Sequence, residues 1–154
     1  GHIDQSLFAR AILDEKNGPP PEINLFNEKN NGESLLNLID KNYIKSAHDI
    51  SLGGLITALS KMCIKGNKGI KLNKPKNLIN EIEYYFAEDQ GRYLIEIDPK
   101  DFEKVTDILN KNSVHHEKLG VIIKNEMIIN DKTKVTIDEL KSYNTNWLTD
   151  YMSS

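Results

Sequence analysis

Apolar residues recur every three or four positions in several stretches of this chain, which is the spacing of one face of an amphipathic helix. On this pattern helices are expected at residues 5–15, 28–42, 53–65, 77–85, 100–110, 139–143 and 146–152. Short runs of apolar and β-branched residues predict strands at residues 44–48, 69–72, 93–97, 118–123, 127–129 and 134–137. Helices and strands alternate at first, but the last strands are consecutive. This order favours an α+β fold with a mixed sheet over a doubly wound parallel sheet.

Polar residues, glycines and prolines predict where several of these elements end. The run Asn-Gly-Pro-Pro-Pro at residues 17–21 stops the first helix. Gly32 weakens the first turns of the second helix, so Glu33 is an alternative start. Asn125 and Asp131 lie in short connections, which suggests a hairpin or meander among the last strands. Trp147 and Tyr151 stand four residues apart, and we expect them to hold the last helix against the body of the protein.

The segment 46–55, Ser-Ala-His-Asp-Ile-Ser-Leu-Gly-Gly-Leu, is expected to join a strand to a helix by a tight turn. Ser51 stands at the expected N-cap, and Gly53 and Gly54 let the backbone pass close to a neighbour or a ligand. A helix N-terminus with glycines and the adjacent Asp49 could hold a phosphate or a magnesium-bound nucleotide. An ordinary strand-to-helix turn has the same pattern, and both interpretations stay open.

A second polar cluster, Glu88, Asp89, Gln90 and Arg92, lies between an expected helix and an expected strand. These side chains could orient one another through charge-assisted hydrogen bonds. Carboxylate oxygens are also the ligands that Mg²⁺ prefers. The alternative is a polar turn in which Arg92 pairs with one of the acids.

Composition narrows the class of protein. The chain has 154 residues, of which 38% are hydrophobic and 28% charged, which predicts one globular domain over residues 1–154. Its net charge of -3 argues against nucleic-acid binding. Apolar runs are too short to span a membrane, and the start does not resemble a signal peptide. The single cysteine, Cys63, lies on an apolar helix face, which is typical of a core residue in a reducing cytoplasm.

The sequence contains no motif of an enzyme that would be active without further domains. His115 and His116 are adjacent, and the remaining histidines and Cys63 lack metal-ligand spacing, so no metal site is expected. No P-loop, dinucleotide-binding or serine-hydrolase motif occurs, and no complete catalytic set is present. Lysines at 61, 65, 68, 71, 74 and 76 suggest a phosphate-binding surface or, more simply, a solvated face. The start at Gly1 without Met indicates a processed end, a remnant of cloning or a piece of a longer chain.

Two motifs together resemble a known superfamily. Residues 47–55, Ala-His-Asp-Ile-Ser-Leu-Gly-Gly-Leu, resemble the Ala-His-Asp-(Val/Ile)-Ser-(Asp/Glu)-Gly-Gly-Leu signature of the AIR-synthase-like superfamily. Residues 86–93 resemble its Phe-Gly-Glu-(Ser/Asp)-Gln-x-Arg element. The opening residues 1–8, followed by Gly-Pro-Pro-Pro at 18–21, are similar to one family within it, the large subunits of phosphoribosylformylglycinamidine synthases. The resemblance covers essentially the whole chain. It implies the final C-terminal domain, a three-layer α/β/α structure with a mixed sheet, in which residues 1–27 are a leading helix and linker.

The resemblance implies a cytoplasmic ATP-dependent C–N ligase of de novo purine biosynthesis. Such an enzyme makes formylglycinamidine ribonucleotide from formylglycinamide ribonucleotide, ATP and glutamine or ammonia, with Mg²⁺. The catalytic histidine of the family lies in earlier domains, so His48 is not that residue and the fragment alone is expected to be inactive. The implied partners are upstream domains of the same chain, a separate glutaminase and small accessory subunits, with neither nucleic acid nor membrane.

The resemblance also suggests roles for both polar segments. Asp49, Ser51, Gly53 and Gly54 are candidates for lining a nucleotide-bearing cleft whose role is largely structural. The second element is matched by Glu88, Asp89, Gln90 and Arg92. The resemblance implies an enzyme of two similar halves, and in the second half, to which this chain corresponds, these residues are expected to support the structure and not to contact substrate.

One position departs from the superfamily pattern. Leu52 stands where the superfamily usually has an acid, which weakens the case for a metal at this turn. Two alternatives remain. One is the C-terminal domain of another AIR-synthase-like ATP-using enzyme, such as AIR synthase, selenophosphate synthetase or thiamine-phosphate kinase. The other is a free-standing module that assembles a complex.

Overall fold

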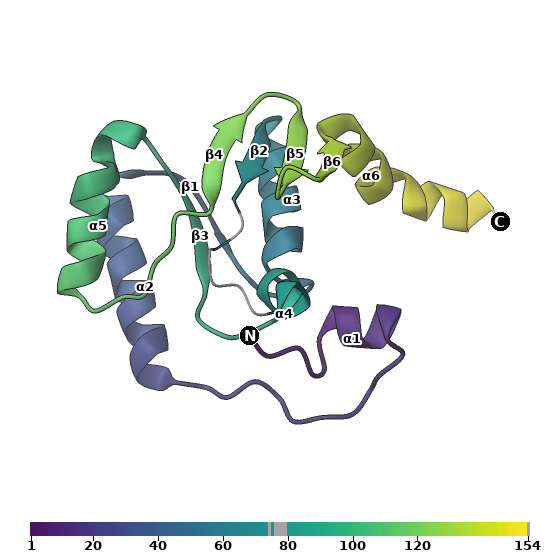
Figure 1. The fold of residues 1–154 in the computed structure, drawn as a ribbon, viewed down its shortest axis with the longest axis horizontal. Coiled ribbons are helices and arrows are strands. Elements are labelled where there is room, and N and C mark those ends of the chain that lie inside the picture. The colour runs from purple at the N-terminus through teal and green to yellow at the C-terminus, as the bar shows by residue number, and fades with distance from the viewer. Residues whose placement is uncertain (74, 76–79, 154) are drawn as a thin grey trace. The chain divides into compact units, whose positions relative to one another are not determined.

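The computed structural model describes residues 1–73, 75 and 80–153. The chain divides into two compact units. The first comprises Gly1–Ala58 and Asn80–Glu117, and the second comprises the described residues within 59–79 and 118–153. Figure 1 labels the helices and strands of both units.

The first unit pairs two strands that are distant in the sequence. Strands β1 and β3 are antiparallel, with Ala47 opposite Ile95. The helix α3 begins in this unit and ends in the second. The elements are α1 (Leu7–Ile12), α2 (Leu25–Asp40), β1 (Ile44–Asp49), α3 (Gly54–Gly66), α4 (Glu81–Phe86), β3 (Tyr93–Ile97), the 3₁₀ turn η1 (Pro99–Asp101) and α5 (Phe102–Lys111).

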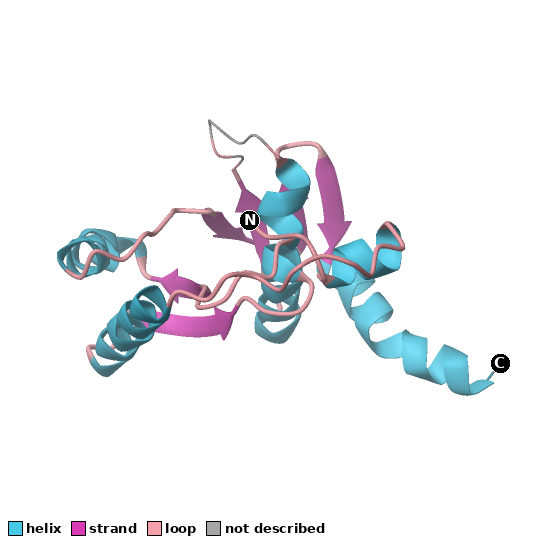
Figure 2. Ribbon diagram, turned by 90° about the horizontal axis from the view of Figure 1, so that it is seen from below, coloured by secondary structure: helices cyan, strands magenta, loops and turns pink. Residues whose placement is uncertain are grey.

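The core of the first unit lies where α2 and α5 meet the β1–β3 pair. Leu38 of α2 packs with Val105 and Leu109 of α5 in a buried apolar cluster. Figures 1 and 2 show these two helices side by side next to the pair of strands. Burial of such a side chain contributes about 1.5–3 kcal/mol, so this cluster holds the helices on the sheet. Partly buried side chains complete it: Tyr43, Ile44, Ile95, Ile97, Ile108 and Val114.

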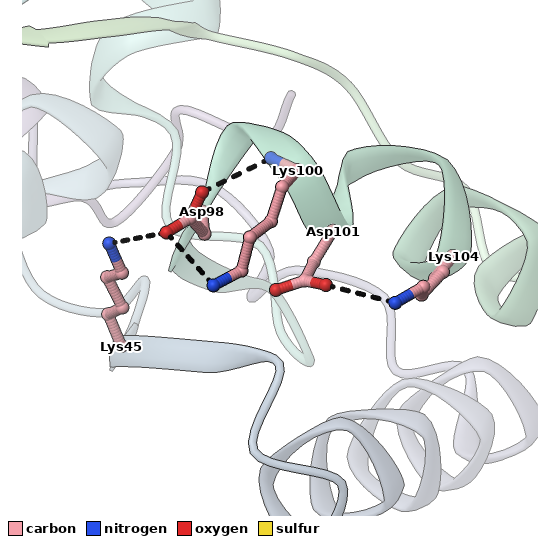
Figure 3. Close-up of polar contacts among 5 residues, drawn as sticks. All are labelled: Lys45, Asp98, Lys100, Asp101 and Lys104. Atoms are coloured by element: carbon pink, nitrogen blue, oxygen red, sulfur yellow. Dashed lines mark hydrogen bonds and ion pairs between the residues drawn. The ribbon is translucent and has the colours of Figure 1, made fainter.

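A polar corner starts α5 directly after β3. The Asp98 carboxylate accepts the backbone N–H of Lys100 at 3.2 Å, and the ammonium of Lys45 on β1 lies 3.2 Å away (Figure 3). The N–H of Lys100 first, and then Lys45, lower the pKa of Asp98. Asp101 pairs with Lys104 at 3.4 Å. The Lys45–Asp98 pair is exposed enough to contribute little to stability, so the main effect of the corner is to fix where the helix begins.

The second unit holds a mixed sheet in the order β4-β2-β5-β6. Strand β2 runs parallel to β5, and the other pairs are antiparallel. The predicted α+β class with a mixed sheet is therefore confirmed. A Cβ at Gly69 would lie 1.9 Å from the backbone oxygen of Glu126, so glycine allows β5 to approach β2. The elements are β2 (Gly69–Leu72), β4 (Gly120–Ile123), β5 (Glu126–Ile129), β6 (Thr133–Thr136) and α6 (Ile137–Ser153).

Of the two predicted alternatives for the last strands, the hairpin is confirmed and the meander is wrong. Strands β5 and β6 form a hairpin, and Asn130 and Asp131 have φ of 53° and 55°, as a tight turn matched to strand twist requires. Strands β4 and β5 are not neighbours, because β2 pairs with both of them. The short connection at Asn125 therefore joins two strands on opposite sides of β2.

Capping residues account for several boundaries that the pattern placed wrongly. Ser6 caps α1, which is shorter than expected, and Asn24 caps α2 at Leu25, ahead of both predicted starts. Gly32 therefore lies inside α2. The two expected C-terminal helices are a single helix, α6, which begins with a reciprocal cap between Thr136 and Glu139.

Two side-chain predictions have opposite outcomes. Cys63 is 6% exposed, which confirms it as a core residue, and burial raises the pKa of its thiol to about 11. Trp147 and Tyr151 are 62% and 72% exposed, so the prediction that they hold the last helix against the body is wrong for the described chain. Residues 77–79 of one predicted helix, and lysines 74 and 76, lie outside the described residues. Among the described residues, no helix has both the length and the apolar character needed to cross a membrane.

Candidate functional site

The turn after β1 and the loop before β3 lie side by side in the first unit. Asp49 pairs with Tyr93 at the end of the strands, and the N–H of Ile50 donates to the carbonyl of Arg92 at 2.8 Å. A pocket of about 330 Å³ opens at this place. Its lining consists of residues 49–52, residues 88–93 and Glu28 of α2.

The pocket brings together both polar segments that the sequence singled out. Asp49 and Ser51 line it from one side. The complete second cluster lines it from the other: Glu88, Asp89, Gln90 and Arg92. Gly53 and Gly54 are buried and are not among the lining residues. Sequence reasoning did not name Tyr93, although it directly follows Arg92 in the second motif, and it missed Glu28, which only the fold brings to this pocket from α2.

The start of α3 differs from the prediction. The helix begins at Gly54, so the N-cap position falls on Gly53, and the prediction of Ser51 as the N-cap is wrong. Instead, the carbonyl of Ser51 accepts the N–H of Gly54 at 2.9 Å and closes the turn. The backbone φ angles of Gly53 and Gly54 are 83° and 69°, values that residues other than glycine rarely adopt.

Gly54 also allows a close approach between two helices. A Cβ at this position would lie 2.6–2.7 Å from the backbone carbonyl carbon and Cα of Phe86, at the end of α4. Ala87, which follows, is fully buried. The glycine therefore brings the start of α3 against the end of α4 and the loop that leads to Glu88.

One carboxylate holds the starts of two helices. The Oε1 atom of Glu88 accepts the N–H of Leu7 at 2.7 Å and the N–H of Gly53 at 2.8 Å. Leu7 is the first residue of α1 and Gly53 directly precedes α3, and the free N–H groups at a helix start favour a negative charge. Glu88 therefore links the starts of these two helices through one carboxylate oxygen.

Asp89 and Arg92 are likewise paired within the protein. Asp89 accepts the backbone N–H of His2 at 2.9 Å through Oδ1 and pairs with Arg92 at 3.1 Å through Oδ2. The guanidinium of Arg92 also donates to the carbonyl of Ala87 at 3.4 Å. These contacts agree with the interpretation of this segment as a polar turn.

The lining of the pocket carries more negative than positive side chains. It presents four carboxylates, those of Glu28, Asp49, Glu88 and Asp89, against one guanidinium that is already paired. Phosphates bind to positive groups or free N–H donors, and none of the described lining residues is a lysine. No cluster of three or more His, Cys, Asp or Glu side chains in the described part of the chain is placed to hold a metal ion. Leu52 is 61% exposed at the position where the superfamily usually has an acid.

Comparison with known proteins assigns the chain to a family. Residues 5–132 match the family described as AIR synthase related protein, C-terminal domain. The chain belongs to this family. The match includes both polar segments of the pocket, and it confirms the resemblance drawn from residues 47–55 and 86–93.

Several curated relatives of this AIR synthase related domain carry the name phosphoribosylformylglycinamidine synthase subunit PurL. The PurL of Pelagibacter ubique (strain HTCC1062) is 66% identical over 154 residues, which is 100% of this chain and 21% of that protein. The PurL of Bartonella bacilliformis is 35% identical over 153 residues, 99% of this chain and 21% of that protein. The chain thus spans about a fifth of the length of the curated relatives it matches.

Solved structures share the fold of the domain. The phosphoribosylformylglycinamidine synthase II of Thermotoga maritima matches with a TM-score of 0.69 and 18% identity, over 91% of this chain and 24% of that one. T. maritima PurL complexed with ATP matches with a TM-score of 0.66 and 19% identity, with the same coverage. At these identities the likeness establishes the fold of the AIR synthase related domain.

Proposed function

We propose that this chain is the C-terminal part of the large subunit of a phosphoribosylformylglycinamidine synthase. The observation that carries the proposal is the 66% identity to Pelagibacter ubique PurL over all 154 residues. The complete polypeptide is then a cytoplasmic ATP-dependent C–N ligase of de novo purine biosynthesis. It makes formylglycinamidine ribonucleotide from formylglycinamide ribonucleotide, ATP and glutamine or ammonia.

In this proposal the residues that line the pocket form one wall of a cleft and take no part in the reaction. The engagement of Glu88, Asp89 and Arg92 with the protein supports that role, since it leaves them few free groups for a ligand. Asp49, whose side chain is 63% exposed, and Ser51 form the wall of a nucleotide-bearing cleft, and Gly53 and Gly54 shape the turn behind it. ATP and Mg²⁺ are held mainly by upstream parts of the polypeptide, and the 154-residue chain alone is inactive.

The proposal includes partners outside this chain. Upstream domains of the same polypeptide complete the active site, a separate glutaminase supplies ammonia, and small accessory subunits belong to the same complex. A solved assembly from Thermotoga maritima, described as PurLQS, includes a chain that matches with a TM-score of 0.67 and 19% identity. That assembly supports the multi-subunit form of the proposal.

The size of the natural polypeptide is the first test. An immunoblot of the source cells with an antibody against this chain is expected to show a band several times larger than 17.5 kDa. The purified polypeptide should release ADP from ATP only when formylglycinamide ribonucleotide and ammonia are both present. A band of 17.5 kDa, or no substrate-dependent ADP release, would overturn the proposal. A band of about twice that size would instead indicate a single-copy AIR-synthase-like enzyme.

The framing role of Asp49 has its own test in the longer polypeptide. Asp49→Ala is expected to weaken nucleotide retention or stability more than it slows turnover, because the side chain lines the pocket without a complete catalytic set around it. Asp107→Ala, on the exposed surface of α5, is the matched control. A loss of turnover by several orders of magnitude in a folded Asp49→Ala protein would contradict the framing role.

A further inference from the structure

The second half of α6 carries an exposed apolar face, defined here as Tyr143, Trp147, Leu148, Tyr151 and Met152. Their exposed fractions are 79%, 62%, 51%, 72% and 76%. At 100° per residue they occupy one half of the helix circumference, and of residues 143–153 Asn144 is the one polar residue within that half. The other half carries only polar side chains: Thr145, Asn146, Thr149, Asp150 and Ser153. A contiguous apolar surface of this kind marks an interaction site.

The base of α6 is fixed within the second unit. Ile137 is 3% exposed, and the reciprocal cap between Thr136 and Glu139 starts the helix. Lys141 donates to the side-chain oxygen of Asn67 at 2.6 Å. Figure 1 shows the first turns of α6 beside β6 and the later turns running on to the C-terminus. The apolar face therefore lies on the part of the helix that projects beyond its anchored base.

The extent of the matches indicates where a partner for this face is found. The family match ends at residue 132, so α6 lies outside the part shared across the AIR synthase related family. The PurL relatives, in contrast, match 98–100% of the chain, and the matched part is about a fifth of their own length. The helix thus occurs in long polypeptides, and most of the length of each polypeptide lies outside the matched region.

The area of the face fits a contact between domains of one chain. A large aromatic side chain buries about 150–250 Å², so five large side chains with these exposed fractions offer on the order of 700 Å². Interfaces between domains of one chain bury about 600–1,500 Å². Obligate homodimers bury about 2,000 Å² or more, which exceeds what two such faces provide.

We propose that the apolar face of α6 docks on an upstream domain of the same polypeptide. This inference rests on the proposed function, because it requires the longer chain. It assigns α6 the task of joining the C-terminal domain to the rest of the enzyme, a role that the family match does not cover.

Cysteine labelling in the complete polypeptide tests the docking. Met152→Cys reports on the apolar face, and Thr149→Cys on the polar face of the same turn is the matched control. The rate of maleimide labelling at each site is measured by mass spectrometry in the native and the guanidinium-unfolded protein. We expect native labelling of Met152→Cys to be at least tenfold slower than unfolded labelling, and that of Thr149→Cys to change by less than threefold.

Each other outcome overturns the docking within the chain. Fast native labelling of Met152→Cys shows an uncovered face. Protection that disappears on dilution identifies a second copy, and protection that requires added glutaminase or accessory subunits identifies a separate protein. An active long polypeptide with an unprotected Met152→Cys overturns the docking alone, whereas a natural polypeptide of only 154 residues overturns both proposals.

As a second variant, Trp147→Asp should lower the thermal midpoint of the complete protein, and Thr145→Asp should not.

Discussion

Replacement of Glu88 tests whether one carboxylate stabilises the starts of two helices. Its Oε1 atom accepts the N–H of Leu7 at 2.7 Å and that of Gly53 at 2.8 Å. A hydrogen bond to a charged group contributes about 1.5–3 kcal/mol, and the contact with Leu7 is exposed, which places it at the low end. We therefore expect Glu88→Ala to lower the free energy of unfolding by about 2–4 kcal/mol.

Glu88→Gln separates the charge from the hydrogen bonds. The amide keeps an acceptor oxygen but removes the negative charge near the two helix starts, where a charge contributes about 0.3–1 kcal/mol for each helix. The expected loss for Glu88→Gln is therefore about 1 kcal/mol. In a chain of this size, each kcal/mol lowers the melting temperature by about 2–4 °C.

The assay is guanidinium unfolding of the 154-residue chain at pH 7, followed by far-UV circular dichroism. Hydrogen exchange at the amides of Leu7 and Gly53 gives a local readout, and both amides should exchange faster in Glu88→Ala. The matched controls are Glu22→Ala and Glu22→Gln, which change an exposed glutamate in the linker before α2. Equal unfolding midpoints for Glu88→Ala and Glu22→Ala would refute the stabilising role. A Glu88→Gln protein as stable as the parent would refute the part assigned to the charge.

Three further predictions follow from the same structure. Gly54→Ala should destabilise the chain by about 3 kcal/mol in chemical denaturation, because of strain at a positive φ and overpacking against Phe86. Gly66→Ala is the control, since a Cβ there meets nothing within 4 Å, and it should not destabilise the chain. Equal effects of the two substitutions would refute this explanation. The Cys63 thiol, whose pKa burial raises to about 11, should react with a disulfide reagent at pH 8 only after unfolding, and rapid reaction in the folded chain would contradict its core placement. The pKa of Asp98 is lowered in the folded chain, so its contribution is present above the ordinary value of 3.8 and is lost as pH falls through the folded value. Asp98→Asn should therefore lower the unfolding midpoint at pH 7 and converge with the parent in acid; a difference that persists in acid would rule out the charge as its cause.

Local patterns determined the elements that are both strongly periodic and clearly bounded. The strands at 69–72 and 93–97 have the predicted bounds, because short apolar runs there end at glycine or polar residues. Helix ends were less accurate, since they depend on single hydrogen bonds such as the one from Asn27 to the side chain of Asn24. Polar residues around Asn144 interrupted the apolar pattern of α6, but the backbone continues as one helix because no proline or glycine breaks it.

Strand pairing lay beyond the reach of local patterns. The short connection at Asn125 suggested neighbouring strands, but β2 occupies the place between β4 and β5. That arrangement depends on a close backbone approach at Gly69, which involves Glu126, a residue 57 positions further along the chain. Contacts over such separations follow from packing and leave no period in the sequence.

The sequence by itself determined the two polar motifs, the α+β class and the family, because each depends on residue order or on periodicity within a short window. Only the tertiary structure decided that both motifs line one pocket and that Ser51 does not cap α3. The deciding interactions are hydrogen bonds that Glu88 accepts from the N–H groups of residues 81 and 35 positions away. Such bonds form only when packing brings distant segments together, and burial of the apolar core positions those segments.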